Sequence, residues 1–244
     1  MRDADVVILG EVHDNPFHHA NQARAVTELA PAALVFEQLT PEIARRVTPE
    51  LLDDAVRLEA VLEWQTSGWP DFAMYYPIFA AAPDAAIFGG AADQHDVRRS
   101  MGEGAAQVFG GGAAIFGLDQ PFSEDVQQQE EDLQMRAHCE ALPTEMLAGM
   151  VEAQRLRDAA LAQATVEAVF EARERGSDAP VILITGNGHA RADLAVPAIL
   201  RAMPLDLTVL TVAQFESQAP DVPEFDYWLV TEAAERDDPC AAFK

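Results

Sequence analysis

The sequence predicts a single α/β domain over residues 1–244, with a mainly parallel sheet flanked by helices on both faces. Apolar runs and helical segments alternate, beginning with a strand at 6–9, a helix at 17–29 and a strand at 32–36. Three elements within about forty residues are the spacing of a β-α-β unit with a parallel strand pair. In addition, no repeat and no low-complexity linker divides the chain, which favours one domain.

Turn and capping residues set the predicted boundaries of the later elements. Pro41 stands at a favoured first-turn position, Ser123 is a good N-cap, and Gly176 closes a long helix. The predicted helices cover 41–47, 49–62, 123–140, 143–175 and 197–203, and the predicted strands cover 85–90, 181–185, 207–213 and 227–231. Residues 113–116 fit a short strand or the foot of a helix, and the pattern leaves both open. Most aromatic side chains at 64–79 are expected in the core.

The apolar stripe of the long predicted helix passes through two polar residues, Gln154 and Asp158, which stand one helical turn apart. Polar groups on a buried face need hydrogen-bond partners. The pair could form a structural network or support a polar site, and the sequence leaves these two alternatives open.

Composition argues against several classes of function. The chain has 41 acidic and 16 basic residues and a formal net charge of −25, so nucleic acid and anionic membranes are poor partners. Its only lysine is Lys244, so no internal lysine can form a Schiff base. The chain has no P-loop, no Gly-x-Gly-x-x-Gly after the first strand and no Gly-x-Ser-x-Gly elbow. A Rossmann dinucleotide site and an ordinary serine hydrolase are therefore not expected.

The chain as written is expected to be soluble, with a signal sequence either absent or removed. No apolar run reaches the length of a transmembrane helix, and residues 1–5 lack the apolar core of a signal peptide. Cys139 and Cys240 show no Cys-x-x-Cys spacing. We predict that these two cysteines are unpaired and reduced.

Two distant segments share one pattern, a buried strand followed by Gly-x-x-His. Gly10 to His13 follow the first strand, and Gly186 to His189 follow the strand at 181–185. Ligands of parallel α/β sheets bind beyond the carboxyl ends of the strands. We therefore expect the polar residues that follow three of the strands to meet at one edge of the sheet. These residues are Glu11, His13, Glu37, Gln38, Asn187 and His189.

Glutamate and histidine in such a cluster can hold a divalent metal ion or transfer protons. The candidate metal ligands and acid–base groups are Glu11, His13, Glu37 and His189. His18 and His19 are expected on the first helix, with one ring facing the site and the other facing water. The remaining two histidines, His95 and His138, are expected at the surface.

The histidine motifs resemble those of a known family. The segment Leu-Gly-Glu-Val-His-Asp-Asn-Pro-x-His-His, starting at Leu9, resembles the opening motif of the ChaN-like haem-binding uptake family. That family is similar to the wider Tiki and TraB group and, distantly, to the erythromycin esterases. The resemblance continues in order through 35–38, 69–77, 153–158, 185–197 and 226–240, which is nearly the whole chain.

The resemblance implies an α/β fold, haem binding, a homodimer and a link to bacterial iron uptake, often in periplasmic or outer-membrane lipoproteins. The haem-binding residues would then come from Tyr75, Tyr76, His13, His18, His19, Asn187 and His189. The wider group implies an alternative, a metal-dependent esterase or peptidase that uses Glu11, His13, Glu37 and His189. A third hypothesis is a polar cluster with only a structural role. Haem binding is the main hypothesis.

Overall fold

The computed structural model describes residues 1, 3–221, 224–238 and 240–241. The chain forms two compact units. The first comprises residues 1–91 and 161–234, and the second comprises residues 92–160 and 235–244. The sequence prediction of one domain over 1–244 stays a prediction.

The first unit is built on a six-stranded sheet in which each pairing between strands is parallel. The strands are β1 (Val6–Glu11), β2 (Ala33–Phe36), β3 (Ala86–Gly89), β4 (Val181–Gly186), β5 (Val209–Glu216) and β6 (Tyr227–Thr231). Their order in the sheet is β3-β2-β4-β1-β5-β6. Strands β1 and β4 are buried along their whole length, as expected for a parallel sheet with both faces covered. The predicted α/β class is confirmed.

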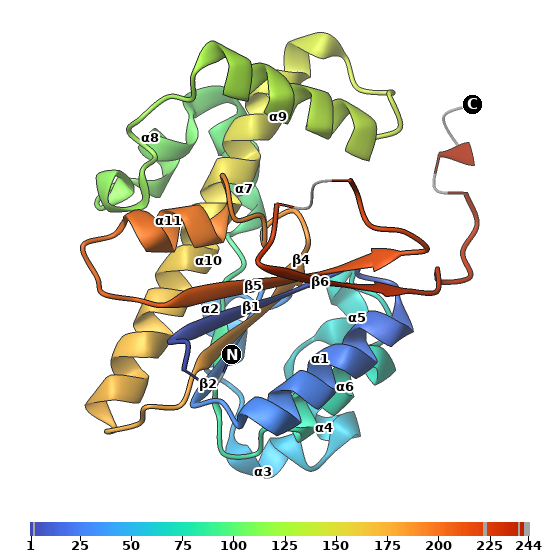
Figure 1. Cartoon of the computed structure of the whole chain (residues 1–244), viewed down its shortest axis with the longest axis vertical. Helices are drawn as coiled ribbons and strands as arrows, with labels where there is room; N and C mark the ends of the chain where they lie inside the picture. The colour runs from blue at the N-terminus through green and yellow to red at the C-terminus, as the bar shows by residue number, and fades with distance from the viewer. Residues whose placement is uncertain (2, 222–223, 239, 242–244) are drawn as a thin grey trace. The chain divides into compact units, whose positions relative to one another are not determined.

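Helices cover both faces of this sheet (Figure 1). The helices of the first unit are α1 (Pro16–Leu29), α2 (Pro41–Ala44), α3 (Pro49–Leu52), α4 (Ala55–Val61), α5 (Trp64–Ser67), α6 (Phe72–Ala80), α11 (Val196–Ala202) and the part of α10 (Leu147–Glu174) from Leu161 onward. Helices α1 and α3–α6 lie on one face, and α10 and α11 lie on the other. Right-handed crossovers explain the two layers, because the chain moves across the sheet in one direction from β1 to β3 and in the other from β3 to β6.

The aromatic segment at 64–79 packs in the core of this unit, as predicted. Trp64, Tyr75 and Phe79 are buried, and the Phe79 ring stacks on Phe36 with 4.1 Å between centroids. The predicted helix at 49–62 is divided into α3 and α4. The division falls at Asp54, whose side chain accepts a hydrogen bond from Arg57 N (3.1 Å) and so caps α4.

The second unit is helical. It contains α7 (Gln94–Glu103), α8 (Ala105–Phe109), a 3₁₀ helix at Ala113–Phe116, α9 (Glu124–Ala137), a 3₁₀ turn at Thr144–Met146 and the first part of α10. Residues 113–116 are therefore helical, which is one of the two alternatives that the sequence left open. Gln154 and Asp158 lie on α10 in this unit, and neither lacks a polar partner. Their predicted supporting role stays a prediction.

Cys139 and Cys240 form a disulfide in the second unit, with their Cα atoms 5.4 Å apart. The prediction of two reduced thiols is wrong. No local pattern indicates the pairing, because 101 residues separate the two cysteines. In a separate observation, no helix among the described residues is long and apolar enough to cross a membrane.

We expect the double substitution Cys139→Ser and Cys240→Ser to lower the free energy of unfolding by about 2–4 kcal/mol, because the bond closes a long loop in the unfolded chain. Urea denaturation measures this loss. The wild type in excess reductant should match the double variant. Equal stability of the oxidised wild type and the double variant would contradict the assigned pairing.

Candidate functional site

Three strand ends bring the predicted polar residues together at the carboxyl edge of the sheet. β1 and β4 are neighbours, with Glu11 paired to Gly186, and β2 lies on the other side of β4. His13 Nδ1 is 2.8 Å from Glu11 Oε1. His13 Nε2 and His189 Nε2 lie 3.8 Å and 3.5 Å from the same atom, Glu37 Oε1. The two Gly-x-x-His motifs thus contribute to one cluster with the glutamate that follows β2.

The glycine of each motif makes room for a polar side chain of the other motif. A Cβ atom on Gly186 would lie 2.9 Å from His13 Nε2. A Cβ atom on Gly10 would overlap Asn187 Oδ1. The two motifs therefore fit together across the β1–β4 pair, which explains why each strand end carries a glycine.

Glu11 is the buried centre of the cluster. Its Oε1 accepts hydrogen bonds from Tyr75 Oη (2.7 Å) and Gln38 Nε2 (3.2 Å), in addition to the contact with His13. Its Oε2 faces His19 Nδ1 at 3.4 Å. Burial raises the pKa of the Tyr75 hydroxyl far above its ordinary value, and the charge of Glu11 raises that pKa further. Tyr75 is therefore a neutral hydrogen-bond donor in this site.

Glu11 fixes one ring nitrogen of His13, and the other ring nitrogen lies on the side of Glu37 and Gly186. Glu11 Oε1 is a carboxylate oxygen that accepts from Gln38 and Tyr75, so His13 Nδ1 is the donor in their contact, and the neutral form of the ring keeps its lone pair on Nε2. The side chain is 36% exposed and meets the Trp69 ring edge-on at 4.8 Å between centroids. Burial lowers the pKa of His13, but the bond to Glu11 and the charge of Glu37 outweigh it and raise that pKa above its ordinary value.

Glu37 is positioned by its Oε2 atom, which accepts hydrogen bonds from Thr185 Oγ1 (2.7 Å) and Gly186 N (2.7 Å). Its Oε1 atom is left to face the two histidines. Burial would raise the pKa of the Glu37 carboxyl, but His189, His13 and the Gly186 N–H together hold that pKa well below its usual range. The carboxylate is therefore a fixed negative charge between two imidazoles.

His18 and His19 are both buried, so the expectation that one of them faces water is wrong. His18 Nδ1 accepts a hydrogen bond from Val12 N (2.9 Å), and its Nε2 donates to Thr231 Oγ1 (3.0 Å). His19 Nε2 donates to the carbonyl oxygen of His13 (2.8 Å). The sequence could not predict this, because the cover over His18 comes from β6, more than two hundred residues later. Both rings hold the loop that carries His13.

Asn187 and Tyr76 also have contacts of their own. Asn187 Nδ2 donates to the Gln214 carbonyl (2.7 Å), and its Oδ1 accepts from Gln214 N (3.1 Å), so this side chain ties the β4 end to β5. Tyr76 is half-buried and packs against Phe72 with 6.0 Å between ring centroids. The roles assigned to both as haem-binding residues stay predictions.

Three residues of the site were not singled out from the sequence. The sequence pattern predicts Trp69 as part of the aromatic core, and the structure shows that it contacts His13. Thr185, a hydroxyl at the end of an apolar strand, is a signal that could have been used, because it binds Glu37. Gln214 directly follows the predicted strand at 207–213, and no sequence pattern marks it as a site residue. Its side chain nevertheless donates to the carbonyl oxygens of Gly10 (2.9 Å) and His18 (3.2 Å).

The predicted metal ligands do not form a compact ligand group. Among the described residues, the group of His, Cys, Asp or Glu side chains whose ligand atoms all lie within 4.8 Å of one another is Asp93, His95 and Asp96. That group is at the start of α7, where Asp93 caps the helix through His95 N (2.8 Å). In the candidate site, the rings of His13 and His189 both direct Nε2 at Glu37 rather than at a shared vacant point. Metal ligation by these residues stays a prediction.

The pKa values of His13 and His18 are shifted in opposite directions. We therefore expect the free energy of unfolding of the ligand-free protein to pass through a maximum as the pH changes. Burial lowers the pKa of His18, so its contribution is complete above the ordinary histidine pKa of about 6.5 and is lost as the pH falls below it. The pKa of His13 is raised, so its contribution is complete below about 6.5 and is lost as the pH rises.

Urea denaturation from pH 5 to pH 8 measures this maximum. His13→Gln should remove the decline on the alkaline side, and His18→Gln should remove the decline on the acid side. His95→Gln, at an exposed position, should change neither limb. Identical pH profiles for all variants would contradict the assigned pKa directions.

The carboxyl edge of this parallel sheet carries a buried glutamate, a second glutamate and the histidines of the two Gly-x-x-His motifs. The chain is therefore an α/β domain with a Glu/His site at its strand ends. The family model described as "Haem-binding uptake, Tiki superfamily, ChaN" matches residues 1–200. The chain belongs to this family, which confirms the family predicted from the motifs.

Two solved structures are similar. The structure titled "Cofacial heme binding to ChaN of Campylobacter jejuni" has a TM-score of 0.65 and 16% sequence identity, and the match covers 92% of this chain and 87% of that chain. At this identity the likeness shows a shared fold. The type III effector HopBA1 has a TM-score of 0.49 and 15% identity, with 96% of this chain and 90% of that chain covered. No curated protein matches the chain.

Proposed function

We propose that this chain binds haem and that His13 supplies an axial ligand to the iron. Membership of a haem-binding family supports the ligand class. The observation that carries the assignment to His13 is that Glu11 fixes Nδ1 while the side chain stays 36% exposed, so the neutral ring can offer the lone pair of Nε2. A carboxylate on the far nitrogen is the usual partner of a metal-binding histidine, because it fixes the tautomer and strengthens the ligand. Haem, when bound, would supply the iron that this nitrogen would ligate.

Other predicted ligands are engaged elsewhere. The Tyr75 hydroxyl is buried and donates to Glu11, so ligation through its oxygen would break that bond. His18 uses both ring nitrogens to hold the loop, and His19 uses Nε2, while its buried Nδ1 faces Glu11. His189 is 8% exposed and faces Glu37. Trp69, beside His13, offers an aromatic surface against which a porphyrin can pack.

The test is a haemin titration of the purified full chain, followed through the Soret band. Wild type should show a saturable, stoichiometric shift. His13→Gly should weaken binding at least about tenfold and lose the spectrum of histidine ligation, and added imidazole should restore that spectrum. His138→Gly is the control for loss of a histidine outside the site. Wild-type haem spectra in His13→Gly would overturn the assignment.

A second candidate is a metal-dependent esterase or peptidase that uses Glu11, His13, Glu37 and His189. It is favoured by one observation, the ionised Glu37 held between two histidine rings, since such a set can transfer protons or bind a divalent ion. Elemental analysis of the purified protein and a screen of ester and peptide substrates test it. The hydrolase would replace haem binding as the proposed function under two conditions. The wild type would hydrolyse a substrate without binding haem saturably, and Glu37→Gln would abolish the hydrolysis.

We also propose that the chain acts in iron uptake outside the reducing cytoplasm. The Cys139–Cys240 disulfide supports such a location, because disulfides persist in oxidising compartments such as the periplasm. Immunoblots of fractions from the native host test this proposal, with alkylation before lysis to report the thiols. Reduced protein in the cytoplasmic fraction would contradict it. A homodimer, as implied by the family, is part of the same proposal.

A further inference from the structure

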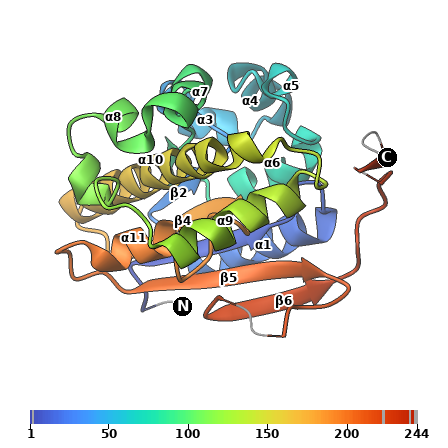
Figure 2. The same ribbon diagram turned by 90° about the horizontal axis from the view of Figure 1, so that it is seen from above.

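The sheet of the first unit ends in two edge strands. Figure 2 shows β6 as the outermost strand on one side, beyond β5. On the other side is β3, which among the described residues pairs with β2 alone. One side of β3 therefore carries backbone N–H and C=O groups without a partner strand, and such groups are a template for pairing with another extended chain.

Ile87 presents such groups on the open side of β3. Ala86 N donates to the carbonyl oxygen of Ala32 (3.1 Å), on the β2 side. Because successive residues of a strand direct their backbone groups to opposite sides, Ile87 and Gly89 direct theirs away from β2. The segment before α2 covers Gly89, since a Cβ atom there would overlap the carbonyl oxygen of Thr40. In the described part of the chain, the N–H and C=O of Ile87 have no hydrogen-bond partner.

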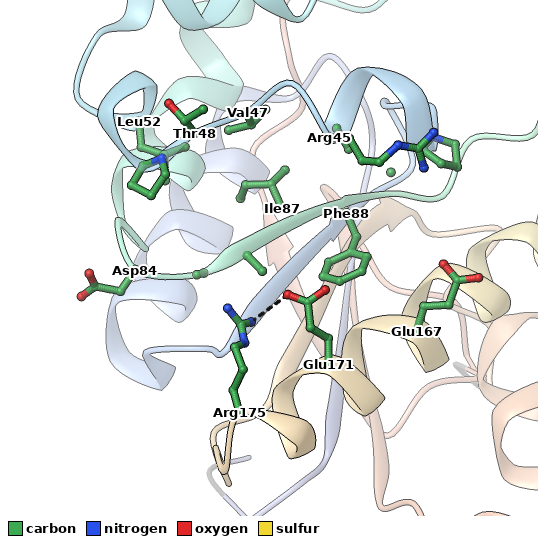
Figure 3. A pocket seen from close by; sticks show the side chains of 16 residues that line it. Arg45, Val47, Thr48, Leu52, Asp84, Ile87, Phe88, Glu167, Glu171 and Arg175 are labelled. Atoms are coloured by element: carbon green, nitrogen blue, oxygen red, sulfur yellow. Dashed lines mark ion pairs between the residues drawn. The ribbon is translucent and has the colours of Figure 1, made fainter.

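A cavity of about 500 Å³ lies along this open edge (Figure 3). Residues 84–89, which include β3, line it between the segment 41–52 and three charged side chains, Glu167 and Glu171 on α10 and Arg175 just after it. All these residues belong to the first unit, and none of them is part of the Glu/His site. The volume falls within the usual range of ligand sites, about 300–1,000 Å³. The cavity therefore joins an unpaired strand edge to a space of ligand size.

The two walls of the cavity differ in charge. On one side of β3 lie the carboxylates of Glu167 and Glu171. Arg175 pairs with Glu171 at 3.4 Å, so this wall keeps a net negative charge. On the other side lie Val47 and Leu52, which belong to the hydrophobic core of this unit or pack against it. A ligand in the cavity therefore meets carboxylates on one side and an apolar surface on the other.

We propose that this cavity binds a short extended peptide that adds a strand to β3. Hydrogen bonds to the backbone of Ile87 would hold the peptide main chain, as in other proteins that recognise peptides at a sheet edge. Side chains of a strand alternate between two faces, so successive residues of the peptide would face the acidic wall and the apolar wall in turn. The occupant is therefore a peptide in which basic and apolar residues alternate, and the formal net charge of −25 favours a basic peptide further.

Opposite charges at the two ends of the cavity define the direction of the peptide. Asp84 lies at the start of the lining stretch 84–89, and Arg45 lies toward its carboxyl end (Figure 3). A peptide parallel to β3 places its amino group near Asp84 and its carboxylate near Arg45, so the charges are complementary at both ends. The stretch 84–89 spans about 17 Å, which matches a peptide of about five residues with free termini.

The first test is isothermal titration calorimetry of the haem-free full chain with the peptide Arg-Val-Arg-Val-Arg, in about 0.15 M salt to screen non-specific attraction. We expect saturable binding of one peptide per chain. Two further peptides carry N-methyl groups, either on residues two and four or on residues three and five. Only alternate N–H groups of an added strand face β3, so one of these two peptides should bind at least about tenfold more weakly than the other. Absence of saturable binding, or equal binding of the two methylated peptides, would overturn the proposal.

Charge reversal on α10 tests the acidic wall. Glu167→Lys should weaken binding of Arg-Val-Arg-Val-Arg at least about fivefold, because it places a like charge beside the peptide. Glu174→Lys is the matched control, since Glu174 is an exposed residue of the same helix that does not line the cavity. If the two variants bind the peptide equally, net charge alone attracts it and the assigned site is wrong.

Amide hydrogen exchange then locates the bound peptide. Saturating peptide should slow exchange of the Ile87 N–H and leave exchange at Leu229, on the opposite edge strand, unchanged. Unchanged exchange at Ile87 would refute strand addition to β3. His13→Gly should bind the peptide like the wild type, so failure of the haem assignment and failure of this proposal are distinguishable.

Discussion

Glu11→Ala is expected to lower the free energy of unfolding by about 3–5 kcal/mol, because it removes the acceptor at the centre of a buried polar network. Burying a carboxylate costs free energy, and the hydrogen bonds from Tyr75, Gln38 and His13 offset that cost. When the carboxylate is removed, these donors stay buried without their acceptor. The loss is expected to exceed that of any surface ion pair in the chain, which is typically worth about 0–1 kcal/mol.

Urea denaturation at neutral pH measures this effect. Glu11→Gln, which keeps the side-chain volume and one acceptor oxygen, should lose less stability than Glu11→Ala. Glu42→Ala is a matched control, because Glu42 is exposed and pairs only at the surface with Arg46 (2.8 Å). A Glu11→Ala variant within about 1 kcal/mol of wild type would show that the network contributes little to folding.

Gly186→Ala is expected to reduce haem affinity by about tenfold or more while the protein stays folded. The added Cβ atom would lie 2.9 Å from His13 Nε2 and 3.0 Å from its Cε1 atom, so the ring has to move away from its position. The backbone at Gly186 does not require a positive φ, so alanine itself introduces no backbone strain. The substitution therefore displaces the proposed ligand and leaves the strand in place.

Gly188→Ala is the matched control, since a Cβ atom at Gly188 would meet no atom within 4 Å. The measurement is a haemin titration beside a thermal melt of each variant. Gly186→Ala should bind weakly and Gly188→Ala should bind like wild type, with similar melting temperatures for both. If Gly186→Ala binds haem like wild type, the position of His13 is not what holds the iron.

Much of the fold followed from short-range patterns. Apolar runs ending in glycine predict β1 and β4, and the rule that parallel strands end at one edge predicts that His13 and Glu37 lie together, as the structure has them. The predictions that were wrong concern residues whose partners lie far along the chain. His18 is buried because Thr231 accepts from it, and Cys139 is oxidised because Cys240 lies beside it.

The functions of individual side chains were harder to predict than their positions. Tyr75 fits a ligand by residue type, but its hydroxyl is committed to Glu11 inside the core. Asn187 fits a ligand-binding residue by its place in a motif, but its amide pairs with the backbone of Gln214. In both cases the direction of a side chain, which no local pattern specifies, decides which atom remains available.

We expect the crossed glycines of the two motifs to favour one alignment of β1 with β4 as the sheet forms. β1 pairs with β4 over long sequence separation, with Val6 beside Val181, so local turns do not fix how the two strands align. A slip by one residue would bring a side chain rather than the hydrogen of Gly186 against His13. The residues that shape the site are therefore also expected to make a misaligned β1–β4 pair less stable than the native one.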